Sequence, residues 1–205
     1  MERALMKELR RWKASPRRKP LVLKGARQVG KTWLMKELGR QCYAKTAYVN
    51  FDRNPRMKQV FDQDLDIERI LMAINLETGV RVTPHDTLII FDEVQEAPRA
   101  ISAFKYFCED APDYHIIAAG SQLGVAIHAG ISFPVGKVNM MQLYPLSFYE
   151  FLHAVGEEGL ARVLDDKNTE MMTLFHDRFT TWLKNYYFIG GMPEAVQAFA
   201  EHHDY

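Results

Sequence analysis

Residues 21–33 read Leu21-Val-Leu-Lys-Gly25-Ala-Arg-Gln-Val-Gly30-Lys31-Thr32-Trp33. They match the G-x-x-x-x-G-K-[S/T] pattern of a phosphate-binding loop (the Walker A motif), with a short apolar run before it and a helical pattern after it. Gly25 and Gly30 allow a tight turn that aims backbone N–H groups at an anion, beside a helix N-terminus whose dipole favours negative charge. In such a site Lys31 reaches the β- and γ-phosphates and the Thr32 hydroxyl binds Mg²⁺.

This motif predicts a nucleotide site formed by a single continuous segment. The residues expected to contact the nucleotide are Gly25, Ala26, Arg27, Gln28, Val29, Gly30, Lys31, Thr32 and Trp33. The alternative is a strand, turn and helix with fortuitous glycines. Average composition produces the pattern by chance in roughly 1% of chains of this length, and the flanking elements reduce that further.

Composition places the chain among ordinary globular proteins. It has 205 residues, enough for one domain or for one domain and part of a second, and 47% of them are hydrophobic. The 26 basic and 26 acidic residues balance, which argues against a nucleic-acid affinity of the whole surface but not against a local patch. Two cysteines without metal-ligand spacing, no apolar run of membrane-spanning length and no signal peptide predict a soluble cytoplasmic protein with no membrane partner.

A second motif follows at Thr87-Leu-Ile-Ile-Phe91-Asp92-Glu93. A continuous apolar run that ends in acids predicts a buried parallel strand that carries carboxylates to its C-terminal end, as in a Walker B motif. We expect Asp92 to hold Mg²⁺, mostly through its waters, and Glu93 to polarise the water that attacks the γ-phosphate. The alternative is that the two acids are ordinary caps at a strand end.

Ser121 ends another apolar run, Tyr114 to Gly120. It is a candidate to sense the γ-phosphate or to orient the attacking water, and it is nearly as well suited to cap the next helix. His115 and His128 are expected near the nucleotide edge, although loop or core roles explain them more simply. The Gly- and Ser-rich segment from Gln122 to Lys137 is predicted to be a mobile loop near the nucleotide.

The N-terminal segment is basic. Residues 2–14 have a helical pattern, and Arg3, Lys7, Arg10, Arg11, Lys13, Arg17, Arg18 and Lys19 far outnumber the acids around them. One interpretation is a patch for nucleic acid or for the acidic face of a partner. The other is a solvated helix face.

The alternation of elements predicts the fold class. Five predicted strands, at residues 21–23, 46–52, 87–93, 114–121 and 138–144, alternate with helices, so we expect an α/β three-layer sandwich with a mostly parallel five-stranded sheet. After Pro145 the chain becomes helical, and the aromatic-rich stretch 169–188 is expected to be one helix that packs in a core. We therefore predict a P-loop core over residues 1–146 and a helical, lid-like segment over residues 147–205.

Several segments together carry a resemblance to a known family. An extra strand (Thr46 to Asp52) between the two motifs, with Glu93 beside Asp92, resembles the additional-strand catalytic-glutamate class of P-loop proteins, whose strand order is 5-1-4-3-2. The motifs also occur in the order found in prokaryotic AAA-type ATPases of the AAA+ superfamily whose N-terminal ATPase domain precedes a C-terminal domain of unknown function. Besides the two motifs above, they are Ala119-Gly-Ser121, Leu143-Tyr-Pro-Leu-Ser-Phe-Tyr-Glu-Phe-Leu152 and Gly190-Gly-Met-Pro-Glu-Ala-Val196.

The resemblance covers essentially the whole chain and implies ATP as the nucleotide, with Mg²⁺. Because members of the family are about twice this length, it also implies that this chain is truncated before a further C-terminal domain. Lys137 stands where many relatives have arginine, and lysine lacks the bidentate guanidinium fork. Arg27 and Arg99 are further candidates to reach a phosphate.

These observations predict an ATPase that acts on the γ-phosphate and couples Mg-ATP binding and hydrolysis to a conformational change in an attached or partner domain. Lys31, Glu93 and Ser121 are its expected catalytic residues. The alternative is a nucleotide-dependent switch or adaptor with little intrinsic hydrolysis, which could associate with nucleic acid. A small-molecule phosphotransferase is disfavoured because Glu93 would activate water, which a kinase must exclude. The client, self-association and a C-terminal effector domain stay open.

Overall fold

The computed structural model describes residues 3–120 and 133–202, and Ser121 and His128 lie outside them. The chain divides into two compact units. The sheet unit comprises Lys7–Gly25 and Lys31–Leu143; the loop–helix unit comprises the described residues of Met1–Met6, Ala26–Gly30 and Tyr144–Tyr205. In the part of the chain that is described, no helix is long and apolar enough to cross a lipid bilayer.

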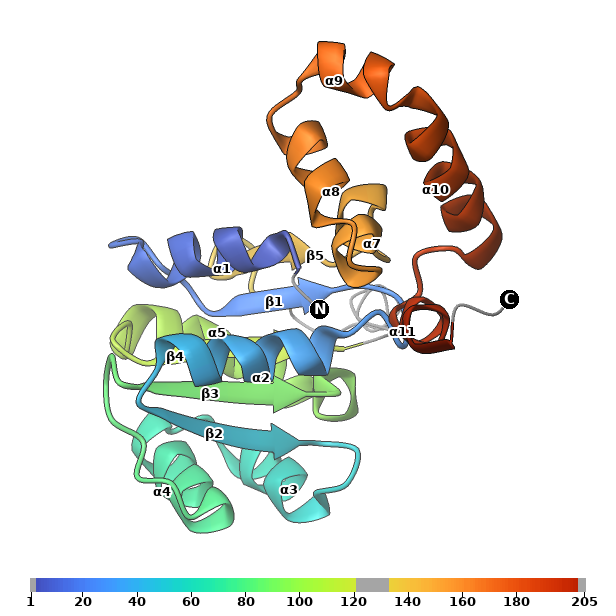
Figure 1. The fold of residues 1–205 in the computed structure, drawn as a ribbon. Coiled ribbons are helices and arrows are strands. Elements are labelled where there is room, and N and C mark those ends of the chain that lie inside the picture. Colours follow the sequence, from blue (N-terminus) through green and yellow to red (C-terminus); the bar gives the residue numbers. More distant parts are fainter. Residues whose placement is uncertain (1–2, 121–132, 203–205) are drawn as a thin grey trace. The chain divides into compact units, whose positions relative to one another are not determined.

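The sheet unit is built on five strands that are parallel to their neighbours, in the order β2-β3-β4-β1-β5. Read from the other edge this is 5-1-4-3-2, so the predicted fold class and strand order are confirmed. Because all strands run the same way, their C-terminal ends meet at one edge of the sheet (Figure 1). The strands are β1 (Leu21–Lys24), β2 (Lys45–Asn50), β3 (Thr87–Asp92), β4 (His115–Ala119) and β5 (Asn139–Gln142).

One face of the sheet is covered by three helices around an aromatic cluster. The Phe51, Phe61 and Phe91 rings lie 5.4–5.7 Å apart, centroid to centroid, and all three side chains are fully buried. Their edge-to-face and tilted geometries are those that aromatic pairs prefer. The covering helices are α3 (Pro55–Gln63), α4 (Ile67–Thr78) and α5 (Pro98–Asp110).

Helix α2 (Lys31–Cys42) covers the other face, where it contacts β2, β3 and β4 (Figure 1). Its buried side chains Leu34, Met35 and Leu38 recur at helical spacing. Alternate strand residues such as Ile90 point to this side, since successive side chains of a strand face opposite ways. Every residue of β3 is buried, as expected for a central parallel strand with helices on both faces.

Side-chain caps explain where several helices begin. The Asn54 side chain accepts a hydrogen bond from the Met57 N–H at 3.0 Å, with Pro55 in the first turn of α3. In the loop–helix unit, Ser147 and Glu150 form a reciprocal capping box at the start of α7 (Phe148–Ala154). The N-terminal helix α1 is shorter than predicted and spans Leu5–Ala14.

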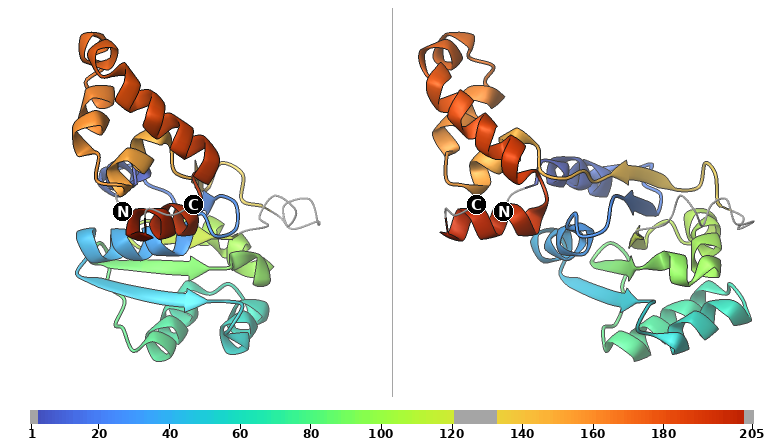
Figure 2. Two further views of the ribbon diagram at one scale, coloured as in Figure 1. Left: turned by 45° about the vertical axis from the view of Figure 1, so that its right-hand side comes forward. Right: turned by 90° about the vertical axis from the view of Figure 1, so that its right-hand side faces the viewer.

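From Phe148 to His202 the secondary-structure elements of the loop–helix unit are helices, connected by short turns. The short helix α9 lies between α8 and α10 in the chain and contacts both, as Figure 2 shows from two sides. Helices α10 and α11 both contact α7. The bounds are α8 (Glu158–Asp165), α9 (Thr169–Leu174), α10 (His176–Ile189) and α11 (Pro193–His202).

The prediction that residues 169–188 form one helix was wrong, and the expected core packing holds for only one stripe of their side chains. The helix is interrupted at Phe175, and neither α9 nor α10 contains a fully buried residue. A helix turns only one stripe toward its neighbours. Here that stripe is Phe175, Phe179, Trp182, Tyr186 and Ile189, which pack against the small clusters around Phe151 and Leu152. Leu174 and Tyr187 lie off the stripe and are 72% and 75% exposed.

Candidate functional site

The predicted phosphate loop connects β1 to α2 and has the backbone of an anion-binding turn. Gln28 and Gly30 have positive φ angles of 61° and 94°. Because residues with a Cβ rarely adopt the conformation of Gly30, glycine is the residue suited to this position. Helix α2 begins at Lys31, directly after the turn, so the positive end of its dipole lies at the loop. The Val29 side chain is fully buried, whereas Ala26, Arg27 and Gln28 are exposed.

Lys31 folds back toward the start of the loop. Its Nζ donates to the Gly25 carbonyl over 2.9 Å, and the residue is 8% exposed. The ammonium group therefore lies beside Gly25, at the start of the loop, rather than in bulk solvent. Trp33, the last residue of the predicted loop set, is 46% exposed on α2.

Thr32 and Asp92, predicted from separate motifs, are in direct contact. The Thr32 hydroxyl donates to Asp92 Oδ2 at 2.7 Å, which joins the first turn of α2 to the C-terminal end of β3. Asp92 is 3% exposed, and its Oδ1 accepts the Glu93 N–H at 3.1 Å. The two motifs, 60 residues apart in sequence, thus form one polar site at the C-terminal edge of the sheet.

Tyr48 is a site residue that sequence reasoning missed. Its hydroxyl donates to Asp92 Oδ2 at 2.8 Å, so this oxygen accepts two hydrogen bonds. Burial, together with Asp92, raises the pKa of Tyr48, and the phenol stays a proton donor. The signal available was the strand order, because it puts β2 beside β3 and makes the polar residues of β2 neighbours of Asp92.

The residues present fit a magnesium ion. Thr32 and Asp92 supply a hydroxyl and a carboxylate oxygen, and Mg²⁺ bound with nucleotides takes one or two such ligands together with phosphate oxygens and water. Within residues 3–120 and 133–202 no group of three or more His, Cys, Asp or Glu side chains could hold a metal by itself. A site that relies on nucleotide oxygens is therefore the one the donor set suits.

Glu93 lies next to Asp92 in an unusual backbone conformation. Its φ and ψ are 50° and 46°, in the left-handed region, and a short 3₁₀-helix, Val94–Glu96, follows it. Its Oε2 accepts a hydrogen bond from Gln95 Nε2 at 2.6 Å. Gln95 Oε1 is buried and has no hydrogen-bond partner among the described residues. The Glu93 carboxylate is thus held by an amide two residues further along.

The other candidate cations have partners elsewhere. Arg99 donates from Nη1 to the Asp62 carbonyl at 3.1 Å, and Lys137 Nζ lies 2.8 Å from Glu109 Oε1. That ion pair, through a hydrogen bond, raises the pKa of Lys137. Arg27 is exposed on the loop itself.

Two sequence expectations need correction. Arg3, assigned to an exposed basic patch or a solvated helix face, is buried and 4% exposed. His115, expected near the nucleotide edge, begins β4 and so lies at the N-terminal edge of the sheet, opposite Asp92. There its Nδ1 is 2.7 Å from the Tyr43 hydroxyl, and burial together with Arg18, His85 and Lys13 lowers its pKa to about 3. The core role given as the simpler explanation is the one observed.

Solved structures with this fold come from several sources. The chain is 15% identical to a Walker-type ATPase of Pyrococcus abyssi, with a TM-score of 0.56 over 98% of this chain and 68% of that one. It is also 15% identical to a chain of Drosophila ORC bound to DNA (TM-score 0.57; 95% and 58% covered) and to a signal transduction ATPase with numerous domains and a tetratricopeptide repeat sensor from Pyrococcus horikoshii (TM-score 0.53; 100% and 30% covered).

At such identities these likenesses show the fold alone. The chain spans little more than half of the ORC chain and less than a third of the signal transduction ATPase. No curated protein matches the sequence. Residues 17–152, more than half of the chain, match the family described as AAA domain. This segment contains the phosphate loop, the five strands and the Thr32–Asp92 contact. The chain therefore belongs to the AAA domain family and carries an AAA-type P-loop ATPase domain.

Proposed function

We propose that this domain binds Mg-ATP, hydrolyses its γ-phosphate and uses the cycle to change the conformation of an attached or partner domain. The observation that carries the proposal is the 2.7 Å hydrogen bond between Thr32 and Asp92, which brings the two motifs into one site. Such a pair supplies oxygen ligands where the phosphates of a loop-bound nucleotide would lie. Bound Mg²⁺ would neutralise charge on the phosphate oxygens.

In this proposal the loop amides of Gly25–Trp33 and the Lys31 ammonium bind the phosphates. Glu93 accepts a proton from the attacking water, the task of a general base. Its position directly after Asp92, the proposed magnesium ligand, supports that role. Ser121, outside the described residues, is proposed to sense the γ-phosphate. Residues 1–146 would act as the ATPase core and residues 147–205 as the segment that responds to the nucleotide.

The contact between Glu93 and Gln95 favours a second candidate function. The 2.6 Å hydrogen bond from the Gln95 amide restrains the orientation of the Glu93 carboxylate, which keeps its other lone pairs for a water molecule. A domain in which this restraint holds the carboxylate away from the attacking water would bind ATP and hardly turn it over, as a switch or adaptor does. One of the neighbours by fold is a chain of ORC bound to DNA, so nucleic acid is a proposed client of such a switch.

Arg99 and Lys137 both have partners in the sheet unit, so we propose that the cation that completes the site comes from outside it. A second copy of the chain or an attached effector domain would supply it, in the cytoplasm of a prokaryotic cell. Phosphate release would then rise per molecule with protein concentration if the second copy is the source.

The test is phosphate release from ATP by purified protein with Mg²⁺, beside Lys31→Ala and Glu93→Gln and over a range of protein concentrations. We expect Lys31→Ala to abolish ATP binding. Glu93→Gln should keep ATP affinity and lose about 100-fold or more in turnover, as a lost general base does. The matched control is Glu96→Gln, an exposed acid three residues away that pairs with Lys58. Unchanged turnover in Glu93→Gln would remove Glu93 from the mechanism, and ATP binding without turnover at every concentration would favour the switch.

A further inference from the structure

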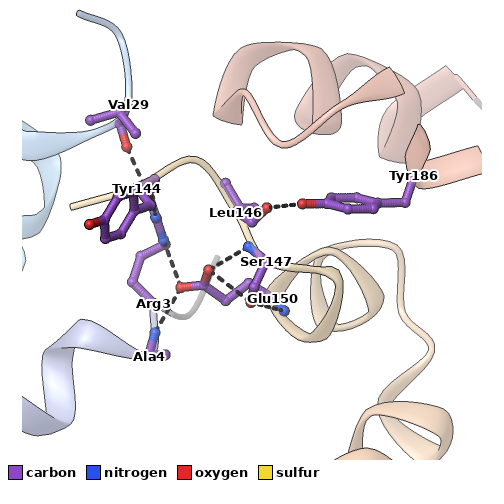
Figure 3. Close-up of polar contacts among 8 residues, drawn as sticks. All are labelled: Arg3, Ala4, Val29, Tyr144, Leu146, Ser147, Glu150 and Tyr186. Carbon is purple, nitrogen blue, oxygen red and sulfur yellow. Dashed lines mark hydrogen bonds and ion pairs between the residues drawn. The ribbon is translucent and has the colours of Figure 1, made fainter. Parts of the chain in front are cut away.

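Arg3 is buried inside the loop–helix unit, and all three of its guanidinium nitrogens donate hydrogen bonds there. Its Nε donates to Glu150 Oε1 at 2.9 Å, its Nη1 to the Val29 carbonyl at 2.9 Å and its Nη2 to the Tyr144 carbonyl at 2.6 Å (Figure 3). Each guanidinium nitrogen thus has an acceptor. A planar fork that uses three directions at once fixes its own position more firmly than a lysine could.

Glu150, which accepts the hydrogen bond from Arg3 Nε, is itself fixed by further hydrogen bonds. Its Oε1 also accepts the Ala4 N–H at 2.9 Å, and its Oε2 accepts the Ser147 N–H at 2.8 Å (Figure 3). Burial alone would raise the pKa of Glu150, but the hydrogen bonds from Ser147, Ala4 and Arg3 outweigh burial and lower it. The carboxylate is therefore charged at neutral pH and anchors Arg3 to the first turn of α7.

The third partner, Val29, belongs to the phosphate loop. It lies between Gln28 and Gly30, whose φ angles of 61° and 94° set the turn. In the trans peptide that joins Val29 to Gly30, the carbonyl and the N–H point in opposite directions. A hydrogen bond that fixes the Val29 carbonyl on Arg3 therefore also fixes the direction of the Gly30 N–H, which points away from Arg3.

We propose that Arg3 is a positioning residue for the phosphate loop: it holds the Val29 carbonyl so that the Gly30 amide faces the phosphate, and Glu150 holds Arg3 in place. This inference rests on the proposed function and extends it. The affinity for the nucleotide then depends on the N-terminal segment and on the start of α7, although neither touches a phosphate. By linkage, nucleotide bound at the loop would stabilise the same contacts.

The test measures the Gly30 amide and the nucleotide separately. The full chain, labelled with ¹⁵N, is compared as wild type, Arg3→Lys and Arg3→Met/Glu150→Gln. The double variant removes both charges together, so no buried charge is left unpaired, and glutamine retains the capping box at α7. The control is Arg178→Lys, because Arg178 pairs with Glu157 at 2.8 Å in the same unit without a contact to the loop.

Without nucleotide, we expect the Gly30 amide resonance and its hydrogen exchange rate to change in both Arg3 variants and not in the control. We expect the dissociation constant for Mg-ATP, measured by calorimetry, to rise about 10- to 100-fold in both Arg3 variants. This is the loss typical of one charge-assisted hydrogen bond, here the one from the Gly30 N–H to the phosphate. Thermal unfolding of the double variant without nucleotide should stay close to wild type, which separates positioning from stability.

Two outcomes would overturn the inference: an unchanged Gly30 amide in folded Arg3 variants, or variants that bind Mg-ATP as tightly as wild type. If wild type itself binds no Mg-ATP, the proposed function fails, while the Gly30 amide of the nucleotide-free protein still decides whether Arg3 orients the loop.

Discussion

Removal of the Tyr48 hydroxyl tests whether the contact on Asp92 prepares a magnesium site. In Tyr48→Phe, Asp92 Oδ2 loses the 2.8 Å hydrogen bond and keeps the one from Thr32. The carboxylate then has one fewer restraint on its orientation toward the Thr32 hydroxyl. Because the ring itself is retained, its packing in β2 and under the Lys36 ammonium, 4.0 Å from the ring centroid, should not change.

The size of the effect follows from the environment. A hydrogen bond to a charged group contributes about 1.5–3 kcal/mol, and we take the lower end because Tyr48 is only half buried. About 1.4 kcal/mol is a factor of ten in an equilibrium constant. We therefore expect the Mg²⁺ concentration at half-maximal nucleotide binding to rise about tenfold, which is within the range for residues that orient metal ligands.

The assay is a Mg²⁺ titration of fluorescent ATP-analogue binding at a fixed analogue concentration. Tyr106→Phe is the matched control, since it removes the same hydroxyl from an exposed position on α5. A Tyr48→Phe midpoint within twofold of wild type, with an intact fold, would refute the argument that Tyr48 orients Asp92. An equal shift in Tyr106→Phe would refute it as well.

Two further predictions concern stability. A Cβ at Gly39 would clash with the Thr46 side chain where α2 meets β2, so Gly39→Ala should destabilise the protein by about 1–3 kcal/mol in urea unfolding, against the usual helical gain from alanine. Gly159→Ala, which meets open space, is the control and should not destabilise it. Because the pKa of His115 is lowered from 6.5 to about 3, the unfolded chain binds a proton that the folded chain does not, and stability should fall as pH drops through this window. His115→Gln should reduce the pH dependence of the unfolding free energy by up to about 1.4 kcal/mol per pH unit. The same pH dependence in the variant and in wild type would contradict the lowered pKa of His115.

The parts of the fold that could be predicted are those encoded by local patterns. Glycine spacing in the loop, the apolar run before Asp92 and the caps at Asn54 and Ser147 each follow from a few adjacent residues. The strand order was implied by the resemblance to the additional-strand catalytic-glutamate class and was confirmed by the sheet. The roles assigned to Lys31, Thr32, Asp92 and Glu93 stay predictions, although Thr32 and Asp92 are in contact.

The rest could not be predicted because it depends on register and on distant partners. The residue that accepts from Arg3 Nε is 147 positions away, and a run of basic residues hides which one is buried. The contact of Tyr48 with Asp92 needs the register of β2 against β3, which alternation does not give. The prediction for α9 and α10 failed for a different reason. Their many aromatic residues suggest that every side of the helix is buried, whereas only one stripe of side chains packs against other helices.

The order of the strands in the sheet determines when each strand can pair with its neighbours during translation. Strand β1 is made early, yet it pairs with β4 and β5, whose residues Ile117 and Asn139 both meet Leu21. At about 5–20 residues per second, roughly 5–20 s of translation separate the apolar Leu21-Val-Leu segment from its first strand partner. Strands β2 and β3 become available to each other sooner and can pair in that interval. The strand that precedes the phosphate loop would thus lack both of its neighbours in the sheet until β4 and then β5 have been synthesised.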